Sequence, residues 1–145
     1  MEIMLGLTLP RDELTVPVAR HIVRTALDRV GVEDACAHDV VVALSEACTN
    51  VLLHAGPGDE YGVRVNVEDE RCRIRVVDVG RGFDSVRLGQ GGAQPEAEQG
   101  RGMTLMRALV DQARFTSRPE TGTIVTLEKT LEFADPALLR DGRGA

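Results

Sequence analysis

The chain has 145 residues, 43% of them hydrophobic and 28% charged, which is typical of one globular domain with a substantial core. A net charge of −6 argues against nucleic acid as a direct partner, and neither an apolar run of membrane-spanning length nor a signal peptide is expected. The cysteines, Cys36, Cys48 and Cys72, are odd in number and lack C-x-x-C spacing, so we expect no disulfide or metal framework and a cytoplasmic location.

The chain begins with a predicted strand and a predicted helix. Residues 2–9 are rich in apolar residues and end at Pro10, which favours a strand. Residues 16–30 follow the helical period, and their apolar stripe ends at Gly31, a residue that readily terminates helices.

The face opposite this stripe carries Arg20, Arg24 and Asp28 at four-residue steps. A solvated surface with an Arg24–Asp28 ion pair is the ordinary interpretation, because oppositely charged residues at this spacing attract each other. Docking of a partner is the alternative.

A second helix is predicted from a cap at Glu33 or Asp34 to about His54, and it contains the run A-L-S-E-A-C-T-N-V-L-L-H-A. Glu46, Asn50 and His54 lie four residues apart and share one face. Helices that are apolar nearly all round are usually buried, so these polar groups need partners, a cation or a ligand. Pairing of Glu46 with an arginine, a loop cap by Asn50 and simple packing by His54 are the structural alternatives.

Two alternating apolar runs follow, residues 61–68 and 71–79, and their short link predicts a β-hairpin. Residues 85–100 are rich in Gly and Gln and lack an apolar stripe, so we expect a mobile loop that forms a lid at about 85–99. A third helix is predicted to begin at Gly100.

Residues 113–117 and 122–131 predict a last pair of strands. We expect one domain over residues 1–133 and a flexible tail over 134–145, because the tail is rich in Gly and charge.

The glycine motifs do not match the commoner phosphate loops. The run G-R-G-F-D-S has Ser85 where a dinucleotide fingerprint needs its third glycine, and no G-x-x-x-x-G-K-[ST] is present. A strand-end carboxylate such as Asp78 can instead accept a hydrogen bond from an exocyclic amine such as that of adenine. Glycines at a helix start, such as Gly100 and Gly102, leave free N–H groups for an anion.

The runs E-A-C-T-N, D-V-G-R-G, G-R-G-M and G-T-I-V resemble, in order, the four motifs of the GHKL ATPase superfamily. The form of the second helix resembles the branch of bacterial anti-sigma factors that are serine-protein kinases of partner-switching systems. The resemblance spans roughly residues 5–131. It implies the Bergerat fold, an α/β two-layer sandwich in which three helices cover one face of a mixed, mainly antiparallel sheet of about five strands.

By position, the resemblance implies roles for five residues around the base and the metal. Asn50 resembles the magnesium-binding asparagine and Glu46 resembles the catalytic base. Asp78 resembles the adenine-binding aspartate, and Gly80 and Gly82 flank the base.

The same resemblance places Gly100, Arg101, Gly102 and Met103 at the ATP phosphates. Thr123 resembles the threonine that backs adenine through water. The implied cofactors are ATP and Mg²⁺.

The resemblance implies a cytoplasmic, homodimeric anti-sigma factor that phosphorylates a STAS-type anti-anti-sigma partner and sequesters a sigma factor, with no direct contact to nucleic acid or membrane. One alternative is a non-catalytic module that binds ATP and holds a sigma factor or another regulator. Another is a detached ATPase or sensor domain. Glu46 favours the kinase, because a binding module needs no base.

Overall fold

A computed structural model describes residues 1–54, 60–78, 94–118 and 122–134. The predicted loop at 85–93, the tail from 135, Gly80 and Gly82 lie outside these residues, so the predictions made for them stay predictions. In chain order the elements are β1 (Glu2–Pro10), a short 3₁₀ helix η1 (Glu13–Thr15), α1 (Val16–Arg29), α2 (Asp34–His54), β2 (Glu60–Glu68), β3 (Arg71–Asp78), α4 (Gln94–Leu109), β4 (Gln112–Arg118) and β5 (Gly122–Thr130).

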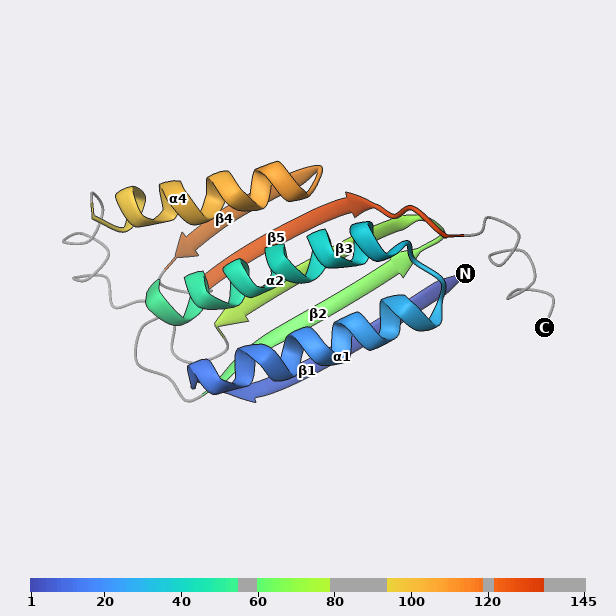
Figure 1. Cartoon of the computed structure of the whole chain (residues 1–145). Helices are drawn as coiled ribbons and strands as arrows, with labels where there is room; N and C mark the ends of the chain where they lie inside the picture. Colours follow the sequence, from blue (N-terminus) through green and yellow to red (C-terminus); the bar gives the residue numbers. More distant parts are fainter. Residues whose placement is uncertain (55–59, 79–93, 119–121, 135–145) are drawn as a thin grey trace.

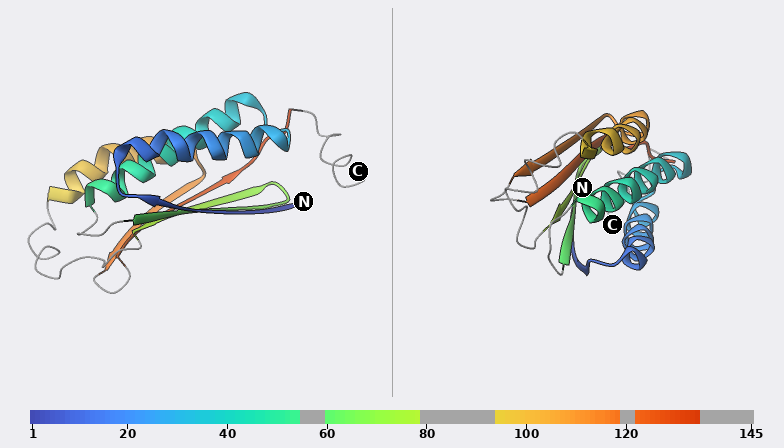
Figure 2. Two further views of the ribbon diagram at one scale, coloured as in Figure 1. Left: turned by 90° about the horizontal axis from the view of Figure 1, so that it is seen from below. Right: turned by 90° about the vertical axis from the view of Figure 1, so that its left-hand side faces the viewer.

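The five strands form one sheet in the order β1-β2-β3-β5-β4, and α1, α2 and α4 cover one of its faces (Figures 1 and 2). The other face is open among the described residues. The predicted two-layer α/β sandwich, the β2–β3 hairpin and the final strand pair are therefore confirmed.

The expectation of a mixed sheet is wrong, because all four neighbouring strand pairs are antiparallel. The chain crosses the sheet twice between β1 and β2, through α1 and α2, so β2 returns antiparallel to β1. A single helix, α4, separates β3 from β4 and makes these two strands run in the same direction (Figure 1). They do not pair, since β5 lies between them.

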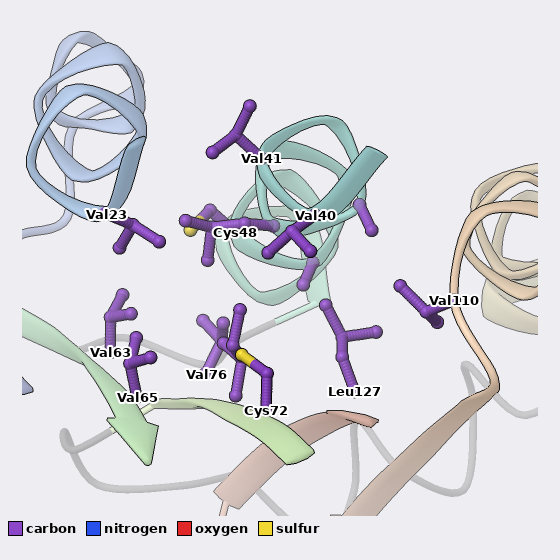
Figure 3. Close-up of a cluster of buried hydrophobic side chains, with 14 of the residues drawn as sticks. Val23, Val40, Val41, Cys48, Val63, Val65, Cys72, Val76, Val110 and Leu127 are labelled. Atoms are coloured by element: carbon purple, nitrogen blue, oxygen red, sulfur yellow. The ribbon is translucent and has the colours of Figure 1, made fainter. Parts of the chain in front are cut away.

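The core lies between the helices and the covered face of the sheet. Alternation along β2 directs Tyr61, Val63, Val65 and Val67 inward. Figure 3 shows side chains of α1 and α2, and Val110 directly after α4, packed above Val63, Val65, Val76 and Leu127 of the sheet. Aliphatic residues supply nearly all of this core, which agrees with the low aromatic content of 3%.

Helix α2 requires a correction. Its residues 34–53 are long and apolar enough, by length and composition, to cross a membrane, although no such run was expected. The same segment is 56% buried inside the fold, where α2 packs between α1 and α4 on the sheet (Figure 2). A core helix enclosed on several sides is apolar for that reason.

Helix α4 also differs from expectation, because it begins at Gln94 and not at Gly100. Glu96, Ala97 and Glu98 favour helices, and Pro95 suits a first helical turn. The prediction of a loop over 94–99 is therefore wrong, because it gave the neighbouring glycines more weight than the helix propensity of these residues.

Helix α1 carries the predicted ion pair, since Arg24 Nε donates to Asp28 Oδ1 at 3.0 Å. Arg24 also pairs with Asp34 at the start of α2. The arginine thus ties the two helices together at their connection, where Gly31 has a φ of 87°.

Candidate functional site

The predicted site residues converge at one end of the molecule. The last turns of α2, the end of β3, the start of β5 and the first half of α4 all lie at the left in Figure 1. The topology requires this, because α2 and β3 run toward that end while α4 and β5 run away from it.

Asn50 and Glu46 occupy successive turns of α2 near this end. Asn50 is 6% exposed, and its Nδ2 has no hydrogen-bond partner among the described residues. Glu46 is less buried than Asn50. The pair therefore combines a buried amide in need of a partner with a carboxylate that a second molecule can reach.

Gly102 of α4 faces Glu46 directly. A Cβ on this glycine would lie 3.8 Å from Glu46 Oε1 and 4.0 Å from Met106 Cε. Met103, one residue further along α4, is buried at 5% exposure. The two helices thus bring two of the predicted motifs into contact, although 56 residues separate Glu46 from Gly102 in the sequence.

Asp78 and Thr123 lie together on the covered face of the sheet. Asp78 ends β3 and Thr123 follows the first residue of β5, one step beyond the paired residues Val77 and Ile124. Asp78 is 2% exposed and Thr123 is fully buried. Thr123 Oγ1 has no hydrogen-bond partner in the described part of the chain. A buried hydroxyl without a partner is uncommon and points to a ligand or a bound water.

One group near the site was missed by sequence analysis. Tyr61 is directly opposite Asp78 in the β2–β3 register, and its hydroxyl lies 2.7 Å from Thr15 Oγ1. The Cys48 thiol interacts with Tyr61, and burial raises the pKa of that thiol to about 12. The network joins β2, α2 and the end of η1 beside Asp78. Its only sequence signal is that Tyr61 is the single tyrosine of the chain.

The glycines of the third motif are not at a helix start. Gly100 and Gly102 lie inside α4, six and eight residues after its first residue. Backbone N–H groups in the interior of a helix are used by the helix itself, so the expected free N–H groups at these glycines are a wrong prediction. Arg101 shares this segment, and its role stays a prediction.

No cluster of three or more His, Cys, Asp or Glu side chains that could hold a metal occurs in residues 1–54, 60–78, 94–118 and 122–134. Asn50 stays the predicted ligand of Mg²⁺, an ion that commonly takes few protein ligands and completes its shell with phosphate and water. The Asn50 atom without a partner among the described residues is Nδ2, an N–H donor, which fits an acceptor atom of a ligand, whereas Mg²⁺ would be held by the amide oxygen.

Comparison with known proteins agrees with this arrangement. Residues 9–129 match the family described as histidine kinase-like ATPase domain. The chain belongs to this family. The match covers all four motifs and confirms the resemblance inferred from them.

Curated relatives place the chain near one branch of the family. It is similar to a serine-protein kinase RsbW of Bacillus licheniformis, with 36% identity over 104 residues that cover 64% of each chain. A serine-protein kinase RsbW of Halalkalibacterium halodurans is 28% identical over 87% of this chain and 82% of the relative. An anti-sigma F factor of Pasteuria penetrans is 34% identical over 65% of this chain and 68% of the relative.

A solved structure supports the fold. The RsbU and RsbW domains of Rv1364c from Mycobacterium tuberculosis match with a TM-score of 0.67 and 24% identity, covering 89% of this chain and 32% of that chain.

Proposed function

We propose that the chain is an ATP-dependent serine-protein kinase and anti-sigma regulatory factor, which phosphorylates a STAS-type anti-anti-sigma partner and sequesters a sigma factor in the cytoplasm. The observation that carries the proposal is that Glu46, Gly102, Asn50 and Thr123 lie at one end of the fold, where Asn50 Nδ2 and Thr123 Oγ1 are buried without a partner among the described residues. The names of the relatives indicate the same class of activity.

Each residue has a task in this proposal. Asp78 accepts a hydrogen bond from the exocyclic amine of adenine, and Thr123 supports the base through a bound water. Gly80 and Gly82 allow close approach of the backbone to the base. Asn50 offers its carbonyl oxygen to Mg²⁺, which neutralises phosphate charge when bound.

Glu46 takes the role of general base. The partner's serine oxygen attacks the γ-phosphorus, the bond to the ADP oxygen breaks, and Glu46 accepts the serine proton. Its partial exposure fits this role, because the serine of a second protein must reach it. Gly102 keeps the opposing surface of α4 free of a side chain next to Glu46 Oε1.

A second candidate function differs from the kinase only in lacking phosphoryl transfer. The chain would bind ATP and hold a sigma factor without transferring phosphate, and Glu46 would then have a packing role. A homodimer belongs to both versions as a further expectation from the family.

Replacement of the base decides between the two. We expect Glu46→Gln to keep ATP affinity within a few-fold and to lower phosphorylation of a STAS partner by about a hundredfold, the usual contribution of a general base. Glu70→Gln is the matched control, because it removes the same charge at the exposed β2–β3 turn at the other end of the sheet. Radiolabelled ATP measures transfer, and calorimetry measures binding.

Two results would contradict the kinase assignment. One is transfer by Glu46→Gln at the rate of the unmodified chain. The other is an unmodified chain that binds its partner and ATP but transfers no phosphate, which would favour the binding module.

A further inference from the structure

The open face of the sheet carries a concentration of arginines in a chain whose net charge is −6. Alternation along β2, β3 and β4 directs these side chains away from the helices. Arg64, Arg71, Arg73, Arg75 and Arg114 all lie on this face.

Three of these arginines share one carboxylate as their ion-pair partner. Glu128 of β5 accepts hydrogen bonds from Arg71 at 3.1 Å and from Arg73 Nε at 3.0 Å, and Arg114 lies 3.7 Å away. The side chain of Glu128 is only 10% exposed. This half of the face is an internally satisfied ion cluster.

The other two arginines lack such a carboxylate. Arg64 and Arg75 are directly opposite each other in the β2–β3 register, and neither forms an ion pair or side-chain hydrogen bond within the described ranges. Like charges opposite each other in a sheet are unfavourable. The stability of the fold therefore does not explain this arginine pair, whereas binding of an external anion would explain it.

The surroundings of this pair are shaped to receive a side chain. Arg64 and Arg75 line a hollow of about 520 Å³ together with Gly6, Gly62, Thr8 and the apolar side chains of Val77 and Ile124. A Cβ on Gly6 would meet nothing within 4 Å, so the hollow is open above β1. Its arginine walls and apolar floor suit a carboxylate on an aliphatic stem.

Carboxylates elsewhere on this face select the class of partner. Glu2, Glu60 and Glu68 lie exposed on the same face, at the ends of β1 and β2. They would repel a nucleic-acid backbone, whose negative charge is continuous. A second copy stacked face to face would tend to bring the two unneutralised arginine pairs toward each other.

We propose that this hollow binds a carboxylate side chain of a protein partner, presented by an extended segment with basic residues on both sides. The partner docks on the sheet face opposite the helices, so the contact is separate from the nucleotide site. Only one sheet layer divides the hollow from the nucleotide site. Val77 and Ile124 line the hollow on the open face, and their chain neighbours Asp78 and Thr123 lie on the covered face.

A short peptide tests the proposal without knowledge of the partner. An acetylated Lys-Val-Glu-Val-Lys amide is titrated into the ¹⁵N-labelled chain, and the arginine Nε–H signals are followed by NMR. We expect saturable shifts at Arg64 and Arg75. Binding should weaken about tenfold or more when the peptide glutamate becomes glutamine, since this removes a charge-assisted hydrogen bond.

Variants locate the contact. Arg64→Gln/Arg75→Gln should lose peptide binding, while Arg29→Gln, an exposed arginine on α1, should keep it. ATP binding should be the same in all three chains, and thermal melting shows that each is folded.

Three results would overturn the proposal. They are equal binding of the glutamine peptide, tighter binding of an oligothymidylate than of the peptide, and conversion of a dimer to a monomer in Arg64→Gln/Arg75→Gln by analytical ultracentrifugation. The last would mean that a second copy covers this face.

Discussion

The two faces of the sheet differ in how their unpaired polar groups are exposed to water. The covered face holds Thr123 Oγ1, which like Asn50 Nδ2 on the helix above is buried and without a partner among the described residues. The open face holds Arg64 and Arg75, which form no ion pair with any described residue but are exposed to solvent. Water satisfies an exposed charge at little cost, whereas a buried unpaired group loses its hydration. The covered face therefore marks a ligand site more strongly.

The largest effect is expected on the covered face at Asp78. Asp78→Asn should weaken ATP binding about ten- to a hundredfold, because a charge-assisted hydrogen bond contributes roughly 1.5–3 kcal/mol. Isothermal calorimetry with Mg-ATP measures the change. Asp69→Asn is the control, since Asp69 lies in the hairpin turn at a φ of 54° that asparagine tolerates. Unchanged affinity in Asp78→Asn would exclude the adenine assignment.

Thr123→Val separates ligand binding from stability. The variant should unfold at higher urea concentration, by about 1 kcal/mol in free energy, because it removes a buried hydroxyl without a partner. It should also bind ATP several-fold more weakly. Thr126→Val on the same strand, which faces the open side, should change neither quantity. A loss of stability in Thr123→Val would mean that the hydroxyl is satisfied inside the protein.

Glu128→Gln tests the ion cluster of the open face. Desolvation raises the pKa of Glu128, but the hydrogen bonds and charges of Arg73 and Arg71 outweigh it and hold the pKa below the ordinary value of 4.5. The ionised form is thus favoured by folding, so its contribution is present above about pH 4.5 and is lost as the pH falls through the lower folded-state value.

At pH 7 we expect Glu128→Gln to lower the free energy of unfolding by about 1 kcal/mol or less, as for ion pairs near the surface. Urea titrations of both chains should show this difference narrowing as the pH is lowered below about 4.5. Glu70→Gln serves as control. A difference that stays constant with pH would show that charge is not its source.

Arg75→Gln should have the smallest effect and the opposite sign. It relieves a like-charge pair, so the free energy of unfolding should rise by a few tenths of a kcal/mol. Arg73→Gln on the same strand should lower it, because it removes a partner of Glu128. Thermal melting of the two variants, measured side by side, tests both expected changes in stability. Equal losses would show that Arg75 also supports the folded state.

The comparison of the two faces also shows how far the sequence can be interpreted. Period-two alternation over residues 71–79 is visible in the sequence, and in the structure it leaves Arg71, Arg73 and Arg75 on one face and Cys72 and Ile74 on the other. Alternation does not say which strand lies next to which. The neutralisation of Arg73 and not of Arg75 depends on Glu128, 55 residues further along the chain than Arg73.

Local signals determined the elements and the motifs. The apolar period, the stop at Gly31 and the alternation of apolar residues predicted the bounds of α1, α2, β2 and β3 to within a few residues. These patterns are local, so a single sequence is enough to detect them. The start of α4 was misjudged, since helix propensity over 94–99 competes with glycines on either side. The order of four motifs indicated the family, and the match over residues 9–129 agrees.

Tertiary structure alone decided what these local signals could not. It placed β5 between β3 and β4 and brought Gly102 against Glu46. It also left Asn50 Nδ2 and the hydroxyl of Thr123 buried without a partner in the part of the chain that the structure describes. It also joined Tyr61 to Thr15 and Cys48 beside Asp78. These contacts connect residues distant in sequence, and their formation depends on how the helices cross the sheet and not on any local pattern.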